Sequence, residues 1–225
     1  MCVTMIPIFD LDDTLYSELS YVHSGFKAVA IFLEREFGWR SKESYDAMRE
    51  SLDTLGRGAI FDCLLKSKGV CSKSIVRRCI SVYRGHSPEI ALNDDAKDLL
   101  SSLRGPVFLV TDGNKIVQAK KVAALGIQSY FTKIYITHRY GVHNCKPSTH
   151  CFRLIRDSLG CDWSDMIYIG DNPAKDFVNL KPIGVKTVRI LTGSYSNVSA
   201  VPDFDADFHI ENLNQLSRIF TLDLV

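Results

Sequence analysis

The chain has 225 residues, of which 46% are hydrophobic and 24% charged, and its formal net charge is +1. This composition is typical of a globular protein with one large domain, or one domain with an insertion. A net charge so near zero gives no electrostatic reason to expect nucleic acid or an anionic membrane as the main partner.

The cysteines and the N-terminal sequence indicate a compartment. The 7 cysteines are odd in number and include no Cys-x-x-Cys pair, so we expect reduced thiols rather than a disulfide framework. No basic and apolar leader precedes the first predicted strand, and no run of about 18 apolar residues occurs, so we expect no export or membrane segment. These features predict a cytoplasmic protein, and no pattern separates a monomer from a homodimer.

The first 90 residues predict one short strand followed only by helices. The apolar run Ile6–Phe9 is typical of a buried strand. Apolar residues at helical spacing, each segment closed by a glycine, then predict four helices, at Tyr21–Phe37, Ser41–Leu55, Ala59–Lys68 and Ser72–Arg84. No strand pattern interrupts them, so we expect an all-helical domain over residues 15–90.

From residue 91 onward, strands and helices alternate. We predict strands at 106–110, 133–137, 166–169, 186–191 and 208–210. We predict helices at 93–103, 115–125, 147–159, 174–180 and 213–220. Such alternation implies right-handed crossovers and a parallel sheet with helices on both faces. The fold expected is therefore α/β: a three-layer, Rossmann-like core built from residues 1–14 and 91–225, with the helical domain inserted.

The first predicted strand stops abruptly at a group of carboxylates. Asp10 and Asp12 are two residues apart, so an extended backbone places both on one side. Two neighbouring carboxylates are costly unless a cation or a proton separates them. Taken alone, this pair is equally typical of a charged turn.

Polar residues also follow the later strands, and ligands bind beyond the carboxyl ends of parallel strands. Thr111 and Asp112 follow one strand, Asp171 and Asp176 follow another, and Lys146 precedes the helix predicted to open at Pro147. A lysine at a helix N-terminus is unfavourable unless an anion lies between them. We therefore expect an anion site, with phosphate as the anion.

The charges of such a site favour a divalent cation. An ionised Asp10 would repel a phosphate about 4 Å away by ~4 kcal/mol per charge pair at an effective dielectric constant of 20. A cation together with the ammonium of Lys146 can offset that repulsion. Asp10 and Asp171 offer the hard oxygen ligands that suit Mg²⁺.

These motifs, in this order, resemble the haloacid dehalogenase superfamily of phosphohydrolases over essentially the whole chain. The stretch Asp10-Leu11-Asp12-Asp13-Thr14-Leu15 is similar to its first motif, Thr111 to the second, Lys146 to the third, and Gly170-Asp171 with Asp176 to the fourth. The helical insertion resembles the cap of the family's first subclass. The resemblance is to the phosphatase-type members.

The resemblance implies a role for each matching residue. Asp10 would be the nucleophile that forms an aspartyl-phosphate. Asp12 would protonate the leaving group and then activate water, and neighbouring negative charge would raise its pKa. Thr111 and the backbone N–H of Asp112 would bind the phosphoryl oxygens. Lys146 would neutralise the nucleophile and the phosphate.

The resemblance also implies the metal ligands. Mg²⁺ would be bound by the carboxylates of Asp10 and Asp171 and by the backbone carbonyl of Asp12. Asp176 would act behind them, through water or Lys146. Asp112 departs from the family, where many members have Asn.

The function expected is hydrolysis of a small phosphorylated metabolite, such as a sugar phosphate or a nucleotide. Asp12 favours phosphate esters over haloacids, because a departing halide needs no proton. A phosphomutase, or a catalytically silent binding protein on the same scaffold, are the alternatives. Tyr16 and Arg57 are candidates for substrate specificity, and the His- and Cys-rich segment 138–151 has no assigned role.

Overall fold

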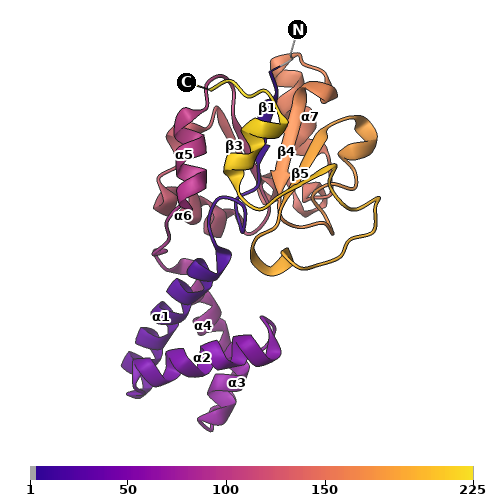
Figure 1. The fold of residues 1–225 in the computed structure, drawn as a ribbon. Helices are drawn as coiled ribbons and strands as arrows, with labels where there is room; N and C mark the ends of the chain where they lie inside the picture. The colour runs from indigo at the N-terminus through magenta and orange to yellow at the C-terminus, as the bar shows by residue number, and fades with distance from the viewer. Residues whose placement is uncertain (1–3, 225) are drawn as a thin grey trace. The chain divides into compact units, whose positions relative to one another are not determined.

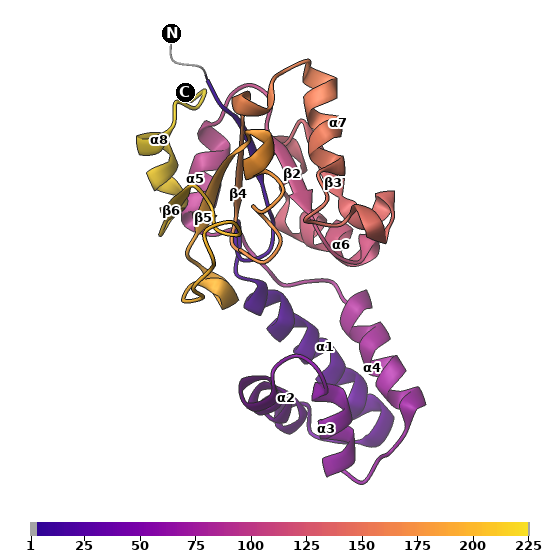
Figure 2. The same ribbon diagram turned by 90° about the vertical axis from the view of Figure 1, so that its right-hand side faces the viewer.

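The computed structural model describes residues 4–224, and Figures 1 and 2 show its ribbon from two sides. Contacts within the chain divide it into two compact units. One is discontinuous, running through Glu18 and resuming at Ala91, and the other comprises Leu19–Ile90. The sequence placed the first boundary after residue 14. That the helical unit acts as a cap stays a prediction.

The α/β unit contains a sheet of six parallel strands in the order β3-β2-β1-β4-β5-β6. Figure 2 shows this order across the sheet. The strands are β1 (Ile6–Phe9), β2 (Phe108–Thr111), β3 (Lys133–Ile136), β4 (Met166–Gly170), β5 (Lys186–Ile190) and β6 (Phe208–Ile210). The first strand of the chain thus lies in the middle of the sheet, and the predicted α/β fold is confirmed.

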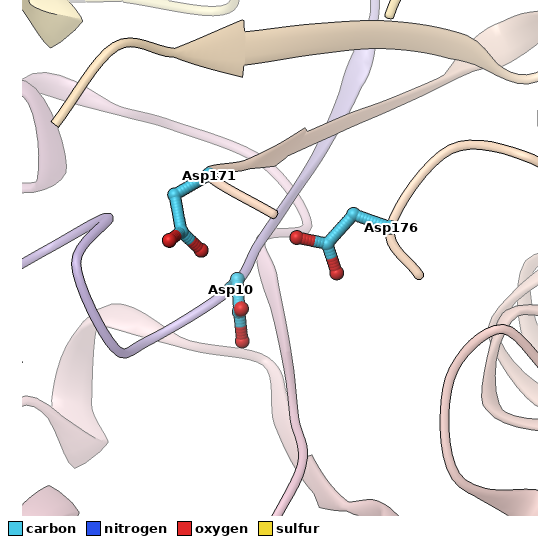
Figure 3. A group of neighbouring side chains, drawn as sticks. All are labelled: Asp10, Asp171 and Asp176. Atoms are coloured by element: carbon cyan, nitrogen blue, oxygen red, sulfur yellow. The ribbon is translucent and has the colours of Figure 1, made fainter. Parts of the chain in front are cut away.

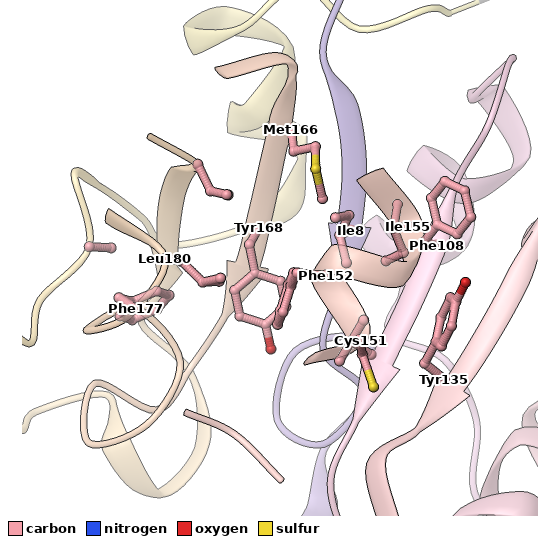
Figure 4. Close-up of a cluster of buried hydrophobic side chains, with 13 residues drawn as sticks. Ile8, Phe108, Tyr135, Cys151, Phe152, Ile155, Met166, Tyr168, Phe177 and Leu180 are labelled. Atoms are coloured by element: carbon pink, nitrogen blue, oxygen red, sulfur yellow. The ribbon is translucent and has the colours of Figure 1, made fainter. Parts of the chain in front are cut away.

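Helices cover both faces of this sheet. Helices α5 (Asp94–Ser102) and α6 (Lys115–Leu125) lie on one side, and α7 (His150–Leu159) lies on the other (Figure 1). Figure 4 shows Phe152 and Ile155 of α7 packed over Ile8, Phe108 and Tyr168 of the central strands. These side chains are at most 2% exposed. Burying each of these side chains stabilises the folded state by about 1.5–3 kcal/mol. This packing holds the central strands, and so their ends, in position.

The helical unit is built from four helices, as the sequence predicted. They are α1 (Glu18–Phe37), α2 (Ser41–Leu55), α3 (Ile60–Ser67) and α4 (Lys73–Gly85). Their inward faces form a separate apolar core around Phe26, Leu33 and Met48. A Cβ at Gly25 would lie 2.4 Å from the Tyr83 ring, so only glycine allows α1 and α4 to pack this closely.

Two predicted helices differ from the structure near the site. The helix expected from Pro147 begins at His150 instead, because Ser148 N–H donates to the carbonyl of Cys145 in a turn. The Lys146–Pro147 peptide is cis, and Lys146 does not lie at a helix N-terminus. The helix expected at 174–180 is a series of turns, begun by the Asn172 side chain accepting from Ala174 N–H.

The C-terminal helix is also shorter than predicted. Residues 213–220 form a 3-10 turn at Leu213–Gln215 and the single helical turn α8 (Leu216–Ile219). Among the described residues, no helix is long and apolar enough to cross a membrane.

Candidate active site

The site lies at the carboxyl edge of the three central strands. Asp10 directly follows β1, Thr111 ends β2, and Asp171 directly follows β4. The backbone N–H of Asp10 donates to the carbonyl of Ile169 at 2.8 Å, which extends the pairing of β1 with β4. Neighbouring parallel strands thereby bring together residues that are far apart in the sequence.

Lys146 provides the ammonium group at the centre of this edge. Its Nζ lies 2.8 Å from Asp10 Oδ2 and 2.7 Å from Asp176 Oδ1, and its side chain is 1% exposed. It also donates to the Tyr168 hydroxyl at 2.8 Å, which in turn donates to Asp176. Burial lowers the pKa of Lys146, but the two carboxylates outweigh burial and hold that pKa well above its usual value. The ammonium is therefore charged at neutral pH.

Three carboxylates lie close together beside the ammonium of Lys146. Figure 3 shows the side chains of Asp10, Asp171 and Asp176 approaching one another from three segments. One oxygen from each lies within 4.8 Å of the others. Burial, together with the neighbouring carboxylates, raises the pKa of Asp10 to about 6 and that of Asp171 to about 8. Full ionisation of the three carboxyl groups would therefore give the cluster more negative charge than Lys146 balances.

The hydrogen-bond donors around each carboxylate indicate which of the three carboxylates have oxygens left to bind a cation. Both oxygens of Asp176 are occupied, Oδ1 by Lys146 and Oδ2 by the backbone N–H of Asn172 at 2.9 Å. Within residues 4–224, no hydrogen-bond donor is found for the Asp171 carboxylate. A Cβ at residue 170 would lie 2.6 Å from Asp176, so glycine there lets Asp176 reach the cluster. Asp10 and Asp171 thus have free ligand capacity, and their excess charge and oxygen donors fit Mg²⁺.

Asp12 lies apart from that cluster and has its own donors. Tyr16 hydroxyl and Lys121 Nζ donate to Asp12 Oδ1, the latter at 2.6 Å, and Gln118 Nε2 donates to Asp12 Oδ2 at 2.9 Å. Burial raises the pKa of Asp12, but Lys121 and the hydrogen bonds outweigh burial and hold the pKa below its usual value. The sequence-based expectation of a raised pKa was wrong, because the buried cation was not foreseen.

The departure at Asp112 has a structural explanation. Its Oδ1 accepts from Thr137 hydroxyl at 2.6 Å and from the backbone N–H of Lys146 at 3.1 Å, while Oδ2 lies 3.5 Å from Lys175 Nζ. Burial raises the pKa of Asp112, but the nearby lysines and these hydrogen bonds keep it lowered. The side chain of Asp112 therefore ties the end of β2 to the segment that carries Lys146.

Asp13 links two loops of this edge and was not singled out from the sequence. Its φ is 52°, and its carboxylate accepts from the backbone N–H groups of Glu18 at 2.8 Å and Ser194 at 3.3 Å. A Cβ at Gly193 would lie 2.1 Å from this carboxylate. The loop after β1 and the loop after β5 are therefore fixed against each other.

The two specificity candidates have different surroundings. Tyr16 is fully buried, and its hydroxyl is engaged by Asp12. Arg57 is exposed in the turn between α2 and α3. A part for either in substrate selection stays a prediction. In residues 4–224, Asp10, Asp171 and Asp176 are the one group of three or more potential metal-binding side chains, so the segment 138–151 contributes none.

Sequence reasoning missed Gln118, Lys121 and Tyr168. Gln118 and Lys121 are three residues apart on α6 and therefore share one face of that helix. A lysine that falls on the buried face of a helix is a signal that could have been noticed. Tyr168 carried no signal, because a tyrosine in a buried strand is ordinary.

Comparison with known proteins gives consistent matches over the chain. Residues 7–184 match the haloacid dehalogenase-like hydrolase family. A glyceraldehyde 3-phosphate phosphatase of Methanocaldococcus jannaschii is 28% identical over 222 residues, which cover 94% of this chain and 95% of that protein. The N-acylneuraminate-9-phosphatase of Mus musculus is 24% identical and is matched over 79% of this chain and 78% of its own.

Solved structures agree with the fold. The hydrolase YfnB of Bacillus subtilis, determined bound to magnesium, superposes with a TM-score of 0.67 at 18% identity, covering 96% of this chain and 98% of its own. A phosphatase from Thermococcus onnurineus gives a TM-score of 0.62 at 21% identity, covering 99% of this chain and 100% of its own. At these identities the likeness concerns the fold.

Proposed function

The chain belongs to the haloacid dehalogenase-like hydrolase family and is an enzyme of the phosphatase type, and from this premise we propose that it hydrolyses the phosphate monoester of a small metabolite with Mg²⁺, through a phosphorylated Asp10. The family predicted from the motifs is thereby confirmed. The proposal rests above all on one observation: the buried ammonium of Lys146 bridges Asp10 and Asp176 at 2.8 and 2.7 Å, beside Asp171.

The first step transfers the phosphoryl group to the protein. A carboxylate oxygen of Asp10 attacks phosphorus, and the bond from phosphorus to the leaving oxygen breaks. That oxygen keeps the electron pair and takes a proton from Asp12. Asp12 must be protonated for this step although Lys121 lowers its pKa, and the negative charge of the bound phosphate favours that protonation. Lys146 keeps Asp10 in place and offsets the repulsion between its carboxylate and the phosphate. Thr111 and the backbone N–H of Asp112 bind the phosphoryl oxygens.

The second step releases phosphate. The Asp12 carboxylate takes a proton from a water molecule, whose oxygen attacks phosphorus. The bond from phosphorus to Asp10 breaks, and its electron pair returns to the Asp10 carboxylate. Inorganic phosphate leaves, and both aspartates are restored to their starting states.

Asp10 and Asp171, with the backbone carbonyl of Asp12, would hold the Mg²⁺. When bound, the ion supplies positive charge that lets two anions meet. Asp176 belongs behind these ligands, because both of its oxygens already accept hydrogen bonds from the protein. The charge of the cluster supports a divalent ion: three carboxylates face one lysine.

We assign the substrate to the class of small sugar phosphates ahead of nucleotides. The relatives named above act, by their names, on glyceraldehyde 3-phosphate and on N-acylneuraminate 9-phosphate. Each is an ester of phosphate with a small, oxygen-rich carbon chain, so the leaving group is a poor one that needs a proton. Asp12 can supply that proton. A phosphomutase, the alternative, would instead return the phosphoryl group to its product.

Release of phosphate from p-nitrophenyl phosphate, with and without EDTA, tests the proposal. We expect turnover that EDTA abolishes, that Mg²⁺ restores and that Asp10→Asn removes. Equal rates for wild type and Asp10→Asn would overturn the assignment of the nucleophile. A panel of sugar phosphates and nucleotides then ranks the substrate classes, and isomerised rather than hydrolysed product with an added bisphosphate would indicate a mutase.

A further inference from the structure

We propose that Gln118 and Lys121 of α6 are positioning residues for the phosphoryl-transfer chemistry: together they aim the Asp12 carboxyl group and align it with the Thr111 hydroxyl. The inference rests on the proposed function and extends it to two residues that no motif marks.

Burying the ammonium group of Lys121 costs solvation free energy. Its side chain is 4% exposed, and its Nζ lies 2.6 Å from Asp12 Oδ1 and 3.8 Å from Glu18 Oε1. A buried ion pair contributes little stability over a well-packed apolar pair, so stability alone gives little reason to place a lysine here. The contact with Asp12 is consistent with a part for Lys121 in the reaction.

Gln118 lies one helical turn before Lys121 and is 1% exposed. Its Nε2 donates to Asp12 Oδ2 at 2.9 Å and to Thr111 Oγ1 at 2.6 Å. One amide group therefore contacts the proposed acid and the proposed phosphate ligand at once. Each oxygen of Asp12 has its own donor from α6, so the carboxyl plane cannot rotate without breaking a contact.

The arrangement serves both steps of the reaction. When Asp12 gives its proton to the leaving oxygen, the carboxylate left behind is met by the Lys121 ammonium and the Gln118 amide. When Asp12 later takes a proton from water, the same contacts keep its direction. Fixed donors of this kind avoid reorganisation during the reaction, and small misplacements of a catalytic group are costly.

The test uses two aryl phosphates that differ in the leaving group. Phenolate is a much stronger base than p-nitrophenolate, so phenyl phosphate depends more on protonation. For Lys121→Met we expect kcat/KM to fall about 100-fold on phenyl phosphate and less than about tenfold on p-nitrophenyl phosphate. Loss of the ammonium leaves more Asp12 protonated, so a lower rate on phenyl phosphate reports a misplaced proton donor and not a missing proton. The second variant, Gln118→Met, should show the same preference, and Lys121→Arg should restore part of the loss.

Lys115→Met is the matched control, because Lys115 is exposed at the start of the same helix, and it should leave both substrates unchanged. Thermal unfolding confirms that each variant is folded. If Lys121→Met does not fold, Gln118→Met decides. Equal losses on both substrates, or no loss, would overturn the inference while leaving the proposed function intact. If the wild type hydrolyses neither ester, the proposed function fails and the inference falls with it.

Discussion

The α/β unit buries Asp10, Lys121, Lys146 and Asp171, whereas the described residues of the helical unit bury just two polar side chains, Ser24 and Ser44. Buried charges are costly and add little to stability, so a cluster of them at the ends of the central strands points to chemistry. An apolar interior such as that of the helical unit serves packing. We therefore expect substitutions in the two interiors to separate activity from stability.

The largest effect is expected at Asp10. Asp10→Asn keeps the size of the side chain but removes the attacking oxygen anion, so kcat should fall by at least about a thousandfold. Its thermal midpoint without metal should not fall, because burial already raises the pKa of Asp10 to about 6. Asp203→Asn, on an exposed acid, is the control and should change neither. A large drop in the midpoint of Asp10→Asn would mean that Asp10 is structural.

The opposite behaviour is expected in the helical unit. Leu33 is fully buried, and Leu33→Ala should lower the free energy of unfolding by about 2–5 kcal/mol through the cavity it leaves. Leu55→Ala, at a position 62% exposed, should change it by less than about 0.5 kcal/mol. Urea unfolding measures both. A cost for Leu33→Ala no larger than that of its control would show that this interior is not a packed core.

The third prediction links metal, pH and stability. A carboxyl group with a raised pKa in the folded state stabilises the fold fully below its unfolded pKa, and that contribution is lost as the pH rises through the folded value. The pKa of Asp10 is raised to about 6 and that of Asp171 to about 8. The metal-free protein should therefore lose stability as the pH rises from about 4 to about 8, most steeply between about pH 4 and pH 6, where both groups contribute.

Mg²⁺ bound to the ionised carboxylates should offset that loss. At about 100 times its dissociation constant it should add about 2.7 kcal/mol. Thermal unfolding with Mg²⁺ and with EDTA measures the gain, which should be large near pH 9 and small near pH 5. A gain of the same size at both pH values would exclude these two carboxylates as the ligands.

Thiol reactivity compares the two interiors without any substitution. Burial raises the pKa of Cys79 in the helical unit, and that of Cys151 in the α/β unit, to about 11. Cys71 is exposed. Since the thiolate is the reactive form, Cys79 and Cys151 should be alkylated at least about 100-fold more slowly than Cys71. Mass spectrometry after brief iodoacetamide treatment measures this, and fast labelling of Cys79 would indicate an open helical core.

The sequence was sufficient for most of the fold and for the residues that meet at the sheet edge. Strand ends that carry Asp10, Thr111 and Asp171 could be placed together, because parallel strands share one carboxyl edge. Four helices of the insertion followed from apolar spacing and closing glycines. These strands and helices could be predicted because each depends on the spacing of apolar residues within its own short segment.

The rest depended on contacts that spacing does not encode. The turn that delays α7 to His150 comes from a backbone hydrogen bond at Ser148. The lowered pKa of Asp12 comes from Lys121, which is 109 residues away in the chain. Asp112 departs from the family pattern, and the sequence gives no reason for it. Its contacts with Thr137 and the backbone of Lys146 show that it ties the end of β2 to the segment that carries Lys146.

The central claim is that Asp10 attacks phosphorus, and trapping the phosphorylated protein tests it most directly. Wild type mixed with a ³²P-labelled phosphate ester and quenched in acid should carry label on the peptide that contains Asp10, in an amount set by the relative rates of phosphorylation and hydrolysis of Asp10. Asp10→Asn should carry none. Label on a peptide without Asp10, or turnover with no labelled protein at any time point, would contradict the account.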